Sequence, residues 1–233
     1  MKSSSEENRD PLLGGFYSPK DAARLLQIAR ADRVSRWVAG DSRNDAVIAG
    51  DYQSLGGKHA LSFWDLMEVR FLEHFRNQGV SLQTLRKVAV RARQEMKVRH
   101  PFALSQLLFL TDRRNVFASV AKEEGDQQTW NLVTNQYELY NAIEETLAKG
   151  VAFDPATGLA QSFQPFAKFP NVIVDPRWAY GRPVIGAKRI PTATLYRLWA
   201  AENGNKARVA SAFNVEESDV TAAIDFESAL AAA

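Results

Sequence analysis

The sequence contains no cysteine among its 233 residues. This absence excludes a disulfide framework, a thiolate metal site and a cysteine nucleophile, and it permits a reducing compartment. A long apolar run is also missing, so we predict no membrane-spanning helix and no membrane partner. The polar start of the chain, residues 1–10, lacks the hydrophobic core of a signal peptide. We therefore expect a cytoplasmic protein that begins with a flexible tail, residues 1–15.

Recognisable catalytic or metal-binding patterns are also lacking. His59, His74 and His100 lie far apart in the sequence and in different contexts, and there is no glycine-rich phosphate loop. Acidic residues occur throughout, so inspection alone does not exclude a pair of carboxylates that act together. We predict no catalytic residue, no metal ligand and no cofactor.

The overall composition is that of an ordinary globular protein. Apolar residues make up 45% of the chain and charged residues 24%. A chain of this length accommodates two or three modules with their own cores. The net charge of +2 is too small to identify a partner, so the distribution of charge has to be considered instead.

Two short helices are expected near the N-terminus. Ser18 is suited to cap the first, and Pro19 occupies its first position. After a turn, the second helix carries Arg30, Arg33 and Arg36 at intervals of three residues. This order is typical of a helix-turn-helix whose second helix reaches DNA phosphates and base edges. An ordinary solvated helix face is the other interpretation.

The segment 40–60 combines glycines with short β-prone pieces such as Val47-Ile48. This pattern predicts a two-stranded wing beside the helices. Arg43 and Lys58 would then contact the DNA backbone without reading its sequence.

Two longer helices follow, from Leu61 to Gly79 and from Ser81 to the His100-Pro101 step. The second combines an apolar stripe with a basic surface, which is either a further phosphate contact or a charged face beside a dimer seam. We predict that the apolar residues of both helices form a core or a homodimer interface. The residues concerned are Trp64, Met67, Phe71, Phe75, Leu85, Val88 and Ala92.

These first hundred residues resemble a known family. The series Tyr17-Ser18, Asp21-Ala22-Ala23-Arg24-Leu25, Arg36-Trp37 and Gly79-Val80-Ser81-Leu82 is similar to the winged helix-turn-helix of MerR-type regulators. The resemblance implies a DNA-binding winged helix-turn-helix over roughly these residues.

The middle region, residues 101–170, is expected to be a small mixed sheet with one helix. Strands are predicted at residues 107–110, 116–120, 129–133, 151–153 and 160–166, and the helix is predicted from Glu138 to Ala148.

The stretch from Asp175 to Pro191 contains prolines and glycines that exclude a helix interior, so we expect a loop or a short strand pair. Three short helices follow it, starting near Thr192, Lys206 and Glu216, in a second helix-turn-helix. Basic side chains are concentrated here, with Glu202 the single acid between Arg182 and Arg208. They suit either a phosphate backbone or an acidic protein partner. The basic residues are Arg182, Lys188, Arg189, Arg197, Lys206 and Arg208.

The last sixty residues resemble a second family. Gly181-Arg182-Pro183-Val184-Ile185, Arg189-Ile190-Pro191 and Ala222-Ala223-Ile224 are similar to the small antitoxin-associated family called domain of unknown function 433. That family has a glycine in place of Ala187 and a threonine in place of Lys188. Together, the two resemblances are those of longer VapB-like antitoxins, and they imply operator binding, autorepression and neutralisation of a PIN-like ribonuclease toxin.

The predicted fold is α+β. It comprises a winged helix-turn-helix with dimerisation helices (residues 16–100), the mixed middle region (101–170) and a three-helix unit (171–233). The predicted function is that of an antitoxin and autorepressor, acting as a homodimer. A MerR-like regulator that binds a ligand in the middle region is the alternative, and an enzyme with a DNA-binding appendage is the third interpretation.

Overall fold

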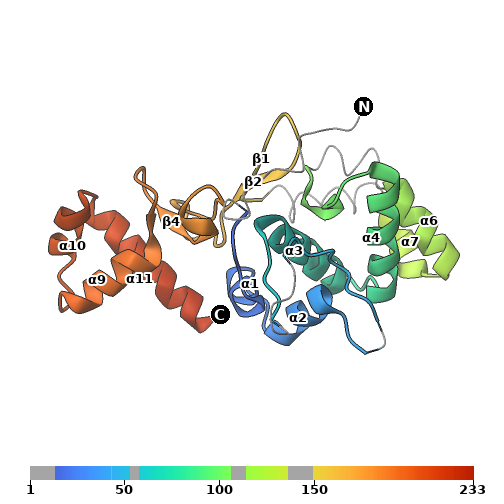
Figure 1. Cartoon of the computed structure of the whole chain (residues 1–233), viewed down its shortest axis with the longest axis horizontal. Coiled ribbons are helices and arrows are strands. Elements are labelled where there is room, and N and C mark those ends of the chain that lie inside the picture. Colours follow the sequence, from blue (N-terminus) through green and yellow to red (C-terminus); the bar gives the residue numbers. More distant parts are fainter. Residues whose placement is uncertain (1–13, 43, 53–57, 106–113, 136–148) are drawn as a thin grey trace.

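The computed structural model describes residues 14–42, 44–52, 58–105, 114–135 and 149–233. Two lobes are visible in Figure 1, and we call them the N-terminal lobe (residues 14–135) and the C-terminal lobe (residues 172–233). Helices of the N-terminal lobe are α1 (Pro19–Leu25), α2 (Ala31–Ala39), α3 (Phe63–Asn77), α4 (Leu82–Met96), the short η2 (Pro101–Ala103), α6 (Arg114–Glu124) and α7 (Gln127–Thr134). Those of the C-terminal lobe are η5 (Ala179–Gly181), α9 (Thr192–Ala201), α10 (Lys206–Phe213) and α11 (Glu217–Ala232).

Helices α1 and α2 form where the sequence predicts them. Ser18 caps α1 in a reciprocal arrangement, because its side chain accepts from the Asp21 amide while the Asp21 carboxylate accepts from the Ser18 amide. Gln27 takes a left-handed conformation, with φ of 55°, in the turn between the helices. Val34 and Trp37 are buried and hold α2 against the rest of the lobe.

Helices α3 and α4 also match the predicted segments, and Ser62 and Ser81 cap them. An aromatic stack packs α3 against η2. The Phe71 ring lies 4.3 Å from that of Phe102 and 4.4 Å from that of Phe75, measured between ring centroids. Because these rings are fully buried, they contribute a large part of the lobe's hydrophobic stabilisation.

Two of the predicted strands are helices instead. Residues 116–120 lie in α6 and residues 129–133 lie in α7. Val116, Phe117 and Val120 are buried at helical spacing, and α6 packs on α4. The prediction failed because apolar runs this short are compatible with either a strand or a buried helix, and only a longer pattern distinguishes the two. The strand predicted at 107–110 and the helix predicted at 138–148 lie outside the described residues.

The described strands pair only antiparallel, so the predicted mixed sheet is not observed in this part of the chain. Strands β1 (Val151–Phe153) and β2 (Ala160–Phe163) form one pair. Strands β3 (Val172–Ile173), β4 (Val184–Ile185) and β5 (Ile190–Pro191) form a second sheet in that order. The stretch 175–191 therefore contains the strand pair that its prolines and glycines left possible.

The described residues of the predicted wing contain no strand pair. Asp41 and Asn44 form an isolated bridge, and the amides of Val47 and Ile48 both donate to the Trp37 carbonyl. Val47 and Ile48 are buried. Valine and isoleucine are common in strands, but here the two residues are buried beside α2 without forming one.

The C-terminal lobe has the three predicted helices, with Thr192 as the first residue of α9 and Asn205 as the cap of α10. Helix α11 is longer than predicted and ends at Ala232. Phe226 of α11 packs against Phe166 and Phe169, with centroid distances of 5.2 and 5.7 Å. These rings fix α11 onto the segment that leads into β3.

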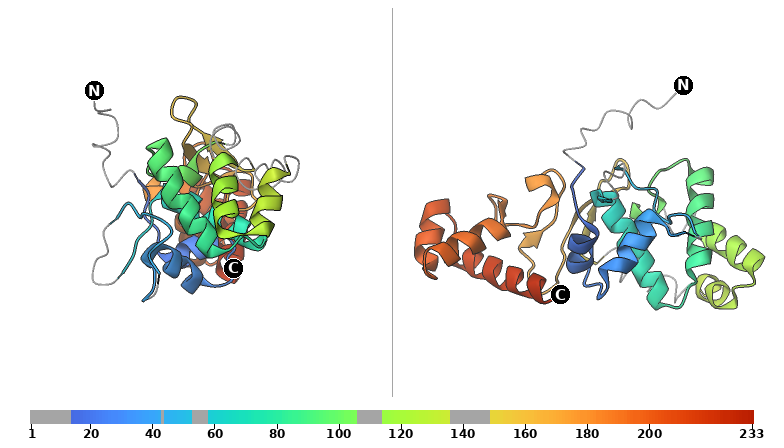
Figure 2. Two further views of the ribbon diagram at one scale, coloured as in Figure 1. Left: turned by 90° about the vertical axis from the view of Figure 1, so that its right-hand side faces the viewer. Right: turned by 60° about the horizontal axis from the view of Figure 1, so that its bottom comes forward.

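The two lobes meet at Tyr17. Its hydroxyl donates to the Gly181 carbonyl at 2.8 Å, and the neighbouring Phe16 amide donates to the Tyr180 carbonyl at 3.2 Å. Burial raises the pKa of Tyr17 well above its usual value. The end of α11 lies beside α1, as two views show (Figures 1 and 2).

Replacement of Gly181 should loosen this contact between the lobes. Gly181 has a φ of 78°, and a Cβ atom there would collide with the Tyr17 hydroxyl. We expect Gly181→Ala to lower the free energy of unfolding by about 2–4 kcal/mol, as measured by urea denaturation. Gly125→Ala is the control, since Gly125 also has a positive φ of 64° but no atom within 4 Å of the place where the new methyl group would lie. Equal losses in the two variants would contradict the proposed close contact.

Candidate nucleic-acid and partner interfaces

Arg30 and Arg36 converge on one carboxylate at the exposed side of α2. Their Nη2 atoms lie 2.9 and 3.2 Å from Asp32 Oδ2, and their side chains are 68% and 54% exposed. The hydrogen bond from Arg30, helped by the charge of both arginines, lowers the pKa of Asp32. Ion pairs this exposed contribute little to stability. Both guanidinium groups are therefore available to exchange Asp32 for a phosphate.

Arg33 has a different environment from its two neighbours. Its guanidinium approaches the Glu73 carboxylate of α3, with Nη1 3.2 Å from Oε1 and Nη2 3.0 Å from Oε2. It also lies 5.3 Å from the centroid of the Trp37 ring. Arg33 thus ties α2 to α3. Of the two predicted wing contacts, Lys58 is exposed and Arg43 lies outside the described residues.

The residues predicted to form a core or a dimer interface are packed inside the single chain. Met67, Phe71, Phe75, Leu85, Val88 and Ala92 are buried, and Trp64 is half-buried, with its indole nitrogen donating to the Ala160 carbonyl at 3.0 Å. In this conformation none of the six buried side chains offers a surface to a second copy. The homodimer stays a prediction that these residues do not support.

Neighbouring elements occupy much of the basic face of α4. Arg86 Nε donates to the Asp45 carbonyl at 2.9 Å, Arg93 Nη2 donates to the Val47 carbonyl at 2.8 Å, and Arg91 pairs with Glu123 at 2.7 Å. These contacts hold the segment 45–47 and α6 in place. They favour an internal role for this face over a second phosphate contact.

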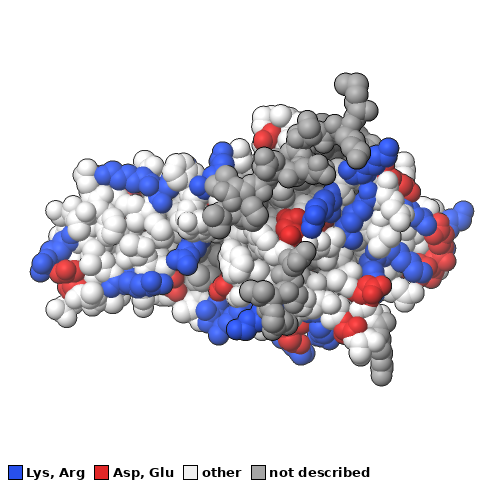
Figure 3. Space-filling view, viewed as in Figure 1, with Lys and Arg blue, Asp and Glu red and all other residues white. Residues whose placement is uncertain are grey.

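The basic residues of the C-terminal lobe are less engaged. Arg208 pairs with Glu202 at 3.1 Å, and Lys188 Nζ donates to the Phe213 carbonyl at 3.3 Å. Among the described residues, no carboxylate lies within ion-pair distance of Arg182, Arg189 or Lys206. Figure 3 shows basic side chains spread among uncharged ones over this lobe, at the left of the view.

Helix α11 has the opposite charge. Its charged residues are Glu217, Asp219, Asp225 and Glu227, and it contains no lysine or arginine. Its N-cap residue is also acidic, Glu216. If α11 were the helix that enters the major groove, its N-terminal residues would lie nearest the DNA, and Glu216, Glu217 and Asp219 would meet phosphates there. Helix α11 is therefore unsuited to reading DNA.

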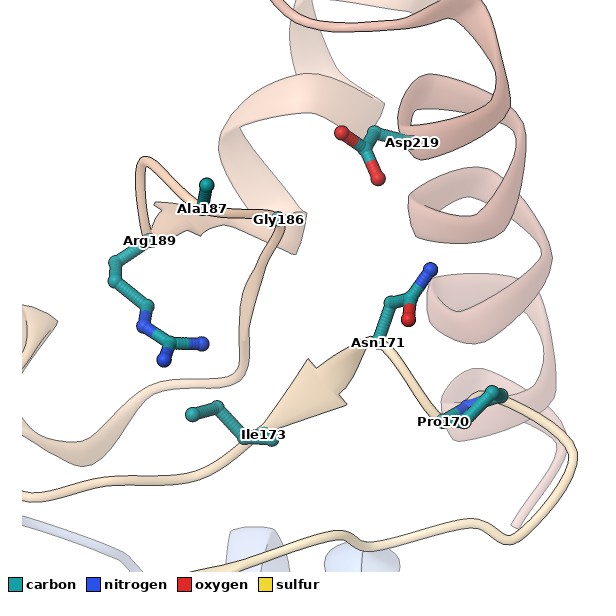
Figure 4. Close-up of a pocket in the computed structure, with 7 residues that line it drawn as sticks. All are labelled: Pro170, Asn171, Ile173, Gly186, Ala187, Arg189 and Asp219. Atoms are coloured by element: carbon teal, nitrogen blue, oxygen red, sulfur yellow. The ribbon is translucent and has the colours of Figure 1, made fainter.

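An open hollow of about 400 Å³ lies between the start of β3, the β4–β5 turn and α11. Figure 4 shows Asn171, Asp219 and Arg189 reaching toward it from these three elements. Gly186 leaves room for Asp219, since a Cβ atom there would lie 2.9 Å from Asp219 Oδ2. The hollow presents one cation, one anion and one amide, which suits a polar segment of a partner.

A buried polar cluster is a feature that sequence inspection missed. One potential ligand atom from each of Asp51, Asp65 and His100 lies within 4.8 Å of the others, and Glu68 adjoins them. Burial alone would lower the pKa of His100, but the carboxylates of Asp51 and Glu68 raise it to about 10. Burial raises the pKa of Asp65 to about 6. The i, i+3 spacing of Asp65 and Glu68 was visible in the sequence, but their convergence with Asp51 and His100 was not.

Comparisons with known proteins match part of the C-terminal lobe to a family model. Residues 172–226 match the model of DUF433, a "protein of unknown function" family. The resemblance predicted for this region is confirmed. No curated protein matches the chain. The crystal structure of Rv2018 from Mycobacterium tuberculosis is similar, with a TM-score of 0.64 and 22% identity over 93% of this chain and 98% of that one.

At this level of identity the likeness to Rv2018 shows a shared fold and not a shared function. It extends over both lobes and is therefore not limited to the DUF433 region. Within the described residues, no helix has the length and apolar character needed to cross a membrane.

The different environments of the α2 arginines predict different effects on stability. Arg33→Ala should lower the free energy of unfolding by about 1–2 kcal/mol, because it leaves the half-buried Glu73 without its partner. Arg30→Ala should have a much smaller effect, since Arg30 is exposed. Urea denaturation of both variants compares them directly. Equal effects would contradict the structural role assigned to Arg33.

Proposed function

We propose that this protein is a type II antitoxin that binds its own operator DNA through α1 and α2, and a PIN-like ribonuclease toxin through its C-terminal lobe. The observation that carries the proposal is that each lobe exposes arginines, whereas the last helix, α11, carries only acids. Arg30, the N-cap residue of α2, and Arg36 are held by Asp32 alone among the described residues, and α11 is unsuited to DNA because its charged residues are all acidic. The two predicted helix-turn-helix units are thereby assigned different partners, DNA for the N-terminal one and the toxin for the C-terminal one.

The DNA-binding part of the proposal rests on α1, the turn that follows it and α2. Helix α1 is capped, a turn follows, and the exposed side of α2 carries two arginines that are held only by Asp32. Arginine side chains on the second helix of a helix-turn-helix are positioned to bind phosphates and guanine edges. The resemblance of this region to MerR-type regulators supports the same orientation.

The toxin half rests on the C-terminal lobe. Arg182 and Arg189 have no carboxylate within ion-pair distance in the described part of the chain, and Arg189 borders the hollow shown in Figure 4. A ribonuclease that uses metal ions has a cluster of acidic residues, which such arginines would complement. The resemblance of these residues to antitoxin-associated sequences supports this partner class, while the matched DUF433 model itself describes a family of unknown function.

The alternative, a MerR-like regulator with a ligand in the middle region, gains no specific support. The hollow described above is lined mainly by the C-terminal lobe, with Pro170 at the end of the middle region and Asn171 beside it. We therefore retain the antitoxin as the proposed function, with the homodimer as an expectation for DNA binding.

Removal of two exposed arginines from α2 tests the DNA half. The double variant Arg30→Ala/Arg36→Ala should bind the DNA upstream of its own gene more weakly, and the slope of log K against log salt should fall by about 2. Gel-shift titrations at several salt concentrations measure both quantities. The control is Arg182→Ala/Arg189→Ala, which removes the same charge from the other lobe. Equal losses in the two double variants would contradict the assignment to α2.

The same two variants test the toxin half in the opposite sense. Arg182→Ala/Arg189→Ala should weaken binding of the neighbouring gene's product by about 10- to 100-fold, since interface arginines are frequent hot spots. Arg30→Ala/Arg36→Ala should leave that affinity unchanged. Co-expression, co-purification and calorimetry provide the measurement. If the neighbouring product neither co-purifies with the wild-type chain nor is inhibited by it, the antitoxin proposal fails.

A further inference from the structure

Exposed aromatic side chains gather where the two lobes meet. Phe16, Trp178 and Tyr180 are 67%, 47% and 60% exposed, and in the described part of the chain the one other large apolar side chain this exposed is Val90 of α4. The Phe16 amide donates to the Tyr180 carbonyl, which joins a residue of the N-terminal lobe to the other two. We call these three side chains the aromatic patch.

We propose that the aromatic patch binds an unpaired stretch of RNA, whose bases stack on its rings. This binding site is additional to the proposed function, which assigns operator DNA to α2.

The backbone around the two rings of the C-terminal lobe is strained and fixed. Ala179 and Tyr180 take left-handed conformations, with φ of 49° and 57°, which cost free energy for any residue with a side chain. The Gly181 amide donates to the Trp178 carbonyl at 2.9 Å, and the Gly181 carbonyl accepts from the Tyr17 hydroxyl at 2.8 Å. Backbone strain of this kind is typical of ligand-binding sites, and a fixed ring loses little conformational freedom when a ligand binds.

Phe16 is held from the N-terminal lobe. Its ring lies 5.8 Å from that of Tyr52, measured between centroids, and the Tyr52 hydroxyl donates to the carbonyl of Gly15. Tyr52 is partly buried and supports Phe16, whose side chain stays largely exposed. Both lobes therefore hold rings of the aromatic patch in place.

Basic side chains flank the patch, and the segment 166–191 contains no exposed acid. Arg177 and Arg182 bracket the two rings in the sequence, and Asp175 is the single acid of this segment. Asp175 is buried and is occupied by Arg177, whose Nε lies 2.9 Å from Oδ1 and whose Nη2 lies 2.5 Å from Oδ2. The Arg177 side chain is thereby fixed while it stays 56% exposed. A partner of this surface therefore has to supply negative charge.

Rings beside arginines favour a single nucleic-acid strand as that partner. Every base has a flat face that stacks on an aromatic side chain or on a guanidinium plane, and the phosphates supply the negative charge. In a duplex the base faces are already covered by neighbouring bases, so the bases have to be unpaired. The patch therefore differs in its ligand from α2, which is expected to bind a duplex.

Other occupants fit this surface less well. In a two-fold contact with a second copy, the segment 166–191 of that copy would bring further arginines and no exposed acid. An acidic protein would supply the charge, but the large apolar groups exposed at this junction, among the described residues, are aromatic rings without aliphatic neighbours. Such a surface suits stacked bases better than the mixed apolar core of a protein interface.

Polar atoms of the patch favour RNA over single-stranded DNA. Tyr180 carries a hydroxyl, which both donates and accepts, and Trp178 carries an indole N–H. The 2′-hydroxyl of ribose also donates and accepts, so it can bond to either group, whereas deoxyribose lacks it. We therefore expect RNA to bind more tightly than DNA of the same sequence.

Fluorescence anisotropy with the full-length chain tests the proposal. The probe is labelled oligo(U) of about ten nucleotides, which falls within the usual site size of stacking proteins and should bind with a Kd on the order of 10 µM or below. Oligo(dU) should bind about 3- to 10-fold more weakly, because it lacks the 2′-hydroxyl. Absence of oligo(U) binding at about 100 µM, a protein concentration ten times the expected Kd, or equal or tighter binding of oligo(dU), would overturn the proposal.

A duplex of oligo(U) with oligo(A) shows whether the bases have to be unpaired. This comparison uses the Arg30→Ala/Arg36→Ala variant, in which the exposed arginines at α2 no longer attract a duplex. The variant should bind oligo(U) as the wild type does and the duplex at least about tenfold more weakly. Duplex binding as tight as that of oligo(U) would refute stacking as the mode of binding.

Single substitutions locate the site. Phe16→Ala, Trp178→Ala and Tyr180→Ala should each weaken oligo(U) binding by about 5- to 100-fold, since each removes one stacking surface. Trp178→Phe and Tyr180→Phe keep a ring and should retain most of the affinity. Val90→Ala is the matched control, because Val90 is 46% exposed but lies on α4. With circular dichroism confirming the fold, unchanged affinity in Trp178→Ala and Tyr180→Ala, or an equal loss in Val90→Ala, would contradict the assignment.

Binding of the neighbouring gene's product separates an RNA site from a protein interface. Trp178→Ala and Tyr180→Ala should bind that protein as the wild type does in calorimetry. If both variants lose that protein while oligo(U) fails to bind the wild type, the aromatic patch is a protein interface and the proposal is overturned. If the wild type binds oligo(U) but not the neighbouring product, the antitoxin function fails and the RNA site stands.

Discussion

The N-terminal lobe depends on how it accommodates two carboxylates buried on α3. Asp65 and Glu68 have no exposed surface, and isolated buried charges of this kind are costly. The surrounding elements supply the compensation, through His100, Arg93 and the backbone amides that hold both carboxylates. The segment 47–52 and η2 therefore take their positions from electrostatics as much as from apolar packing. Aromatic rings alone would leave this part of the lobe without a defined arrangement.

Charge also separates the two ends of the molecule. On α2, the exposed arginines share one acid, Asp32. Helix α11 has acids alone, and the basic residues of its lobe lie just before β4, in the β4–β5 turn, on α9 and on α10. The helices at the two ends of the chain follow one another in a similar order, but their charges suit different partners. A net charge of +2 conceals this difference, because the opposite charges cancel in the sum.

Local signals in the sequence predicted much of the fold. Ser18 and Ser81 cap helices through contacts three residues away, at the starts that the sequence predicted. Ser62 does the same for α3, close to the start expected at Leu61. The apolar runs 116–120 and 129–133 were predicted wrongly as strands, since they lie in helices whose packing is not local: α6 packs on α4, and α7 packs on α6. The three arginines near and on α2 are evenly spaced in the sequence, but only the structure shows that Arg33 is partly buried and paired with Glu73, whereas Arg30 and Arg36 are exposed. The cluster around His100 joins residues up to 49 positions apart, which no local pattern reveals.

The contact between Tyr17 and Gly181 constrains the order of folding. Its hydrogen bond joins residues 164 positions apart, whereas Tyr17 also bridges Leu61 through a much shorter loop. Closing long loops is slow, and the helices of the C-terminal lobe pack mainly on one another. During synthesis we therefore expect the Tyr17–Leu61 bridge to form well before the Tyr17 hydroxyl bonds to the Gly181 carbonyl. We also expect the two lobes to dock late in folding, and the Tyr17 side chain to remain exposed until they do.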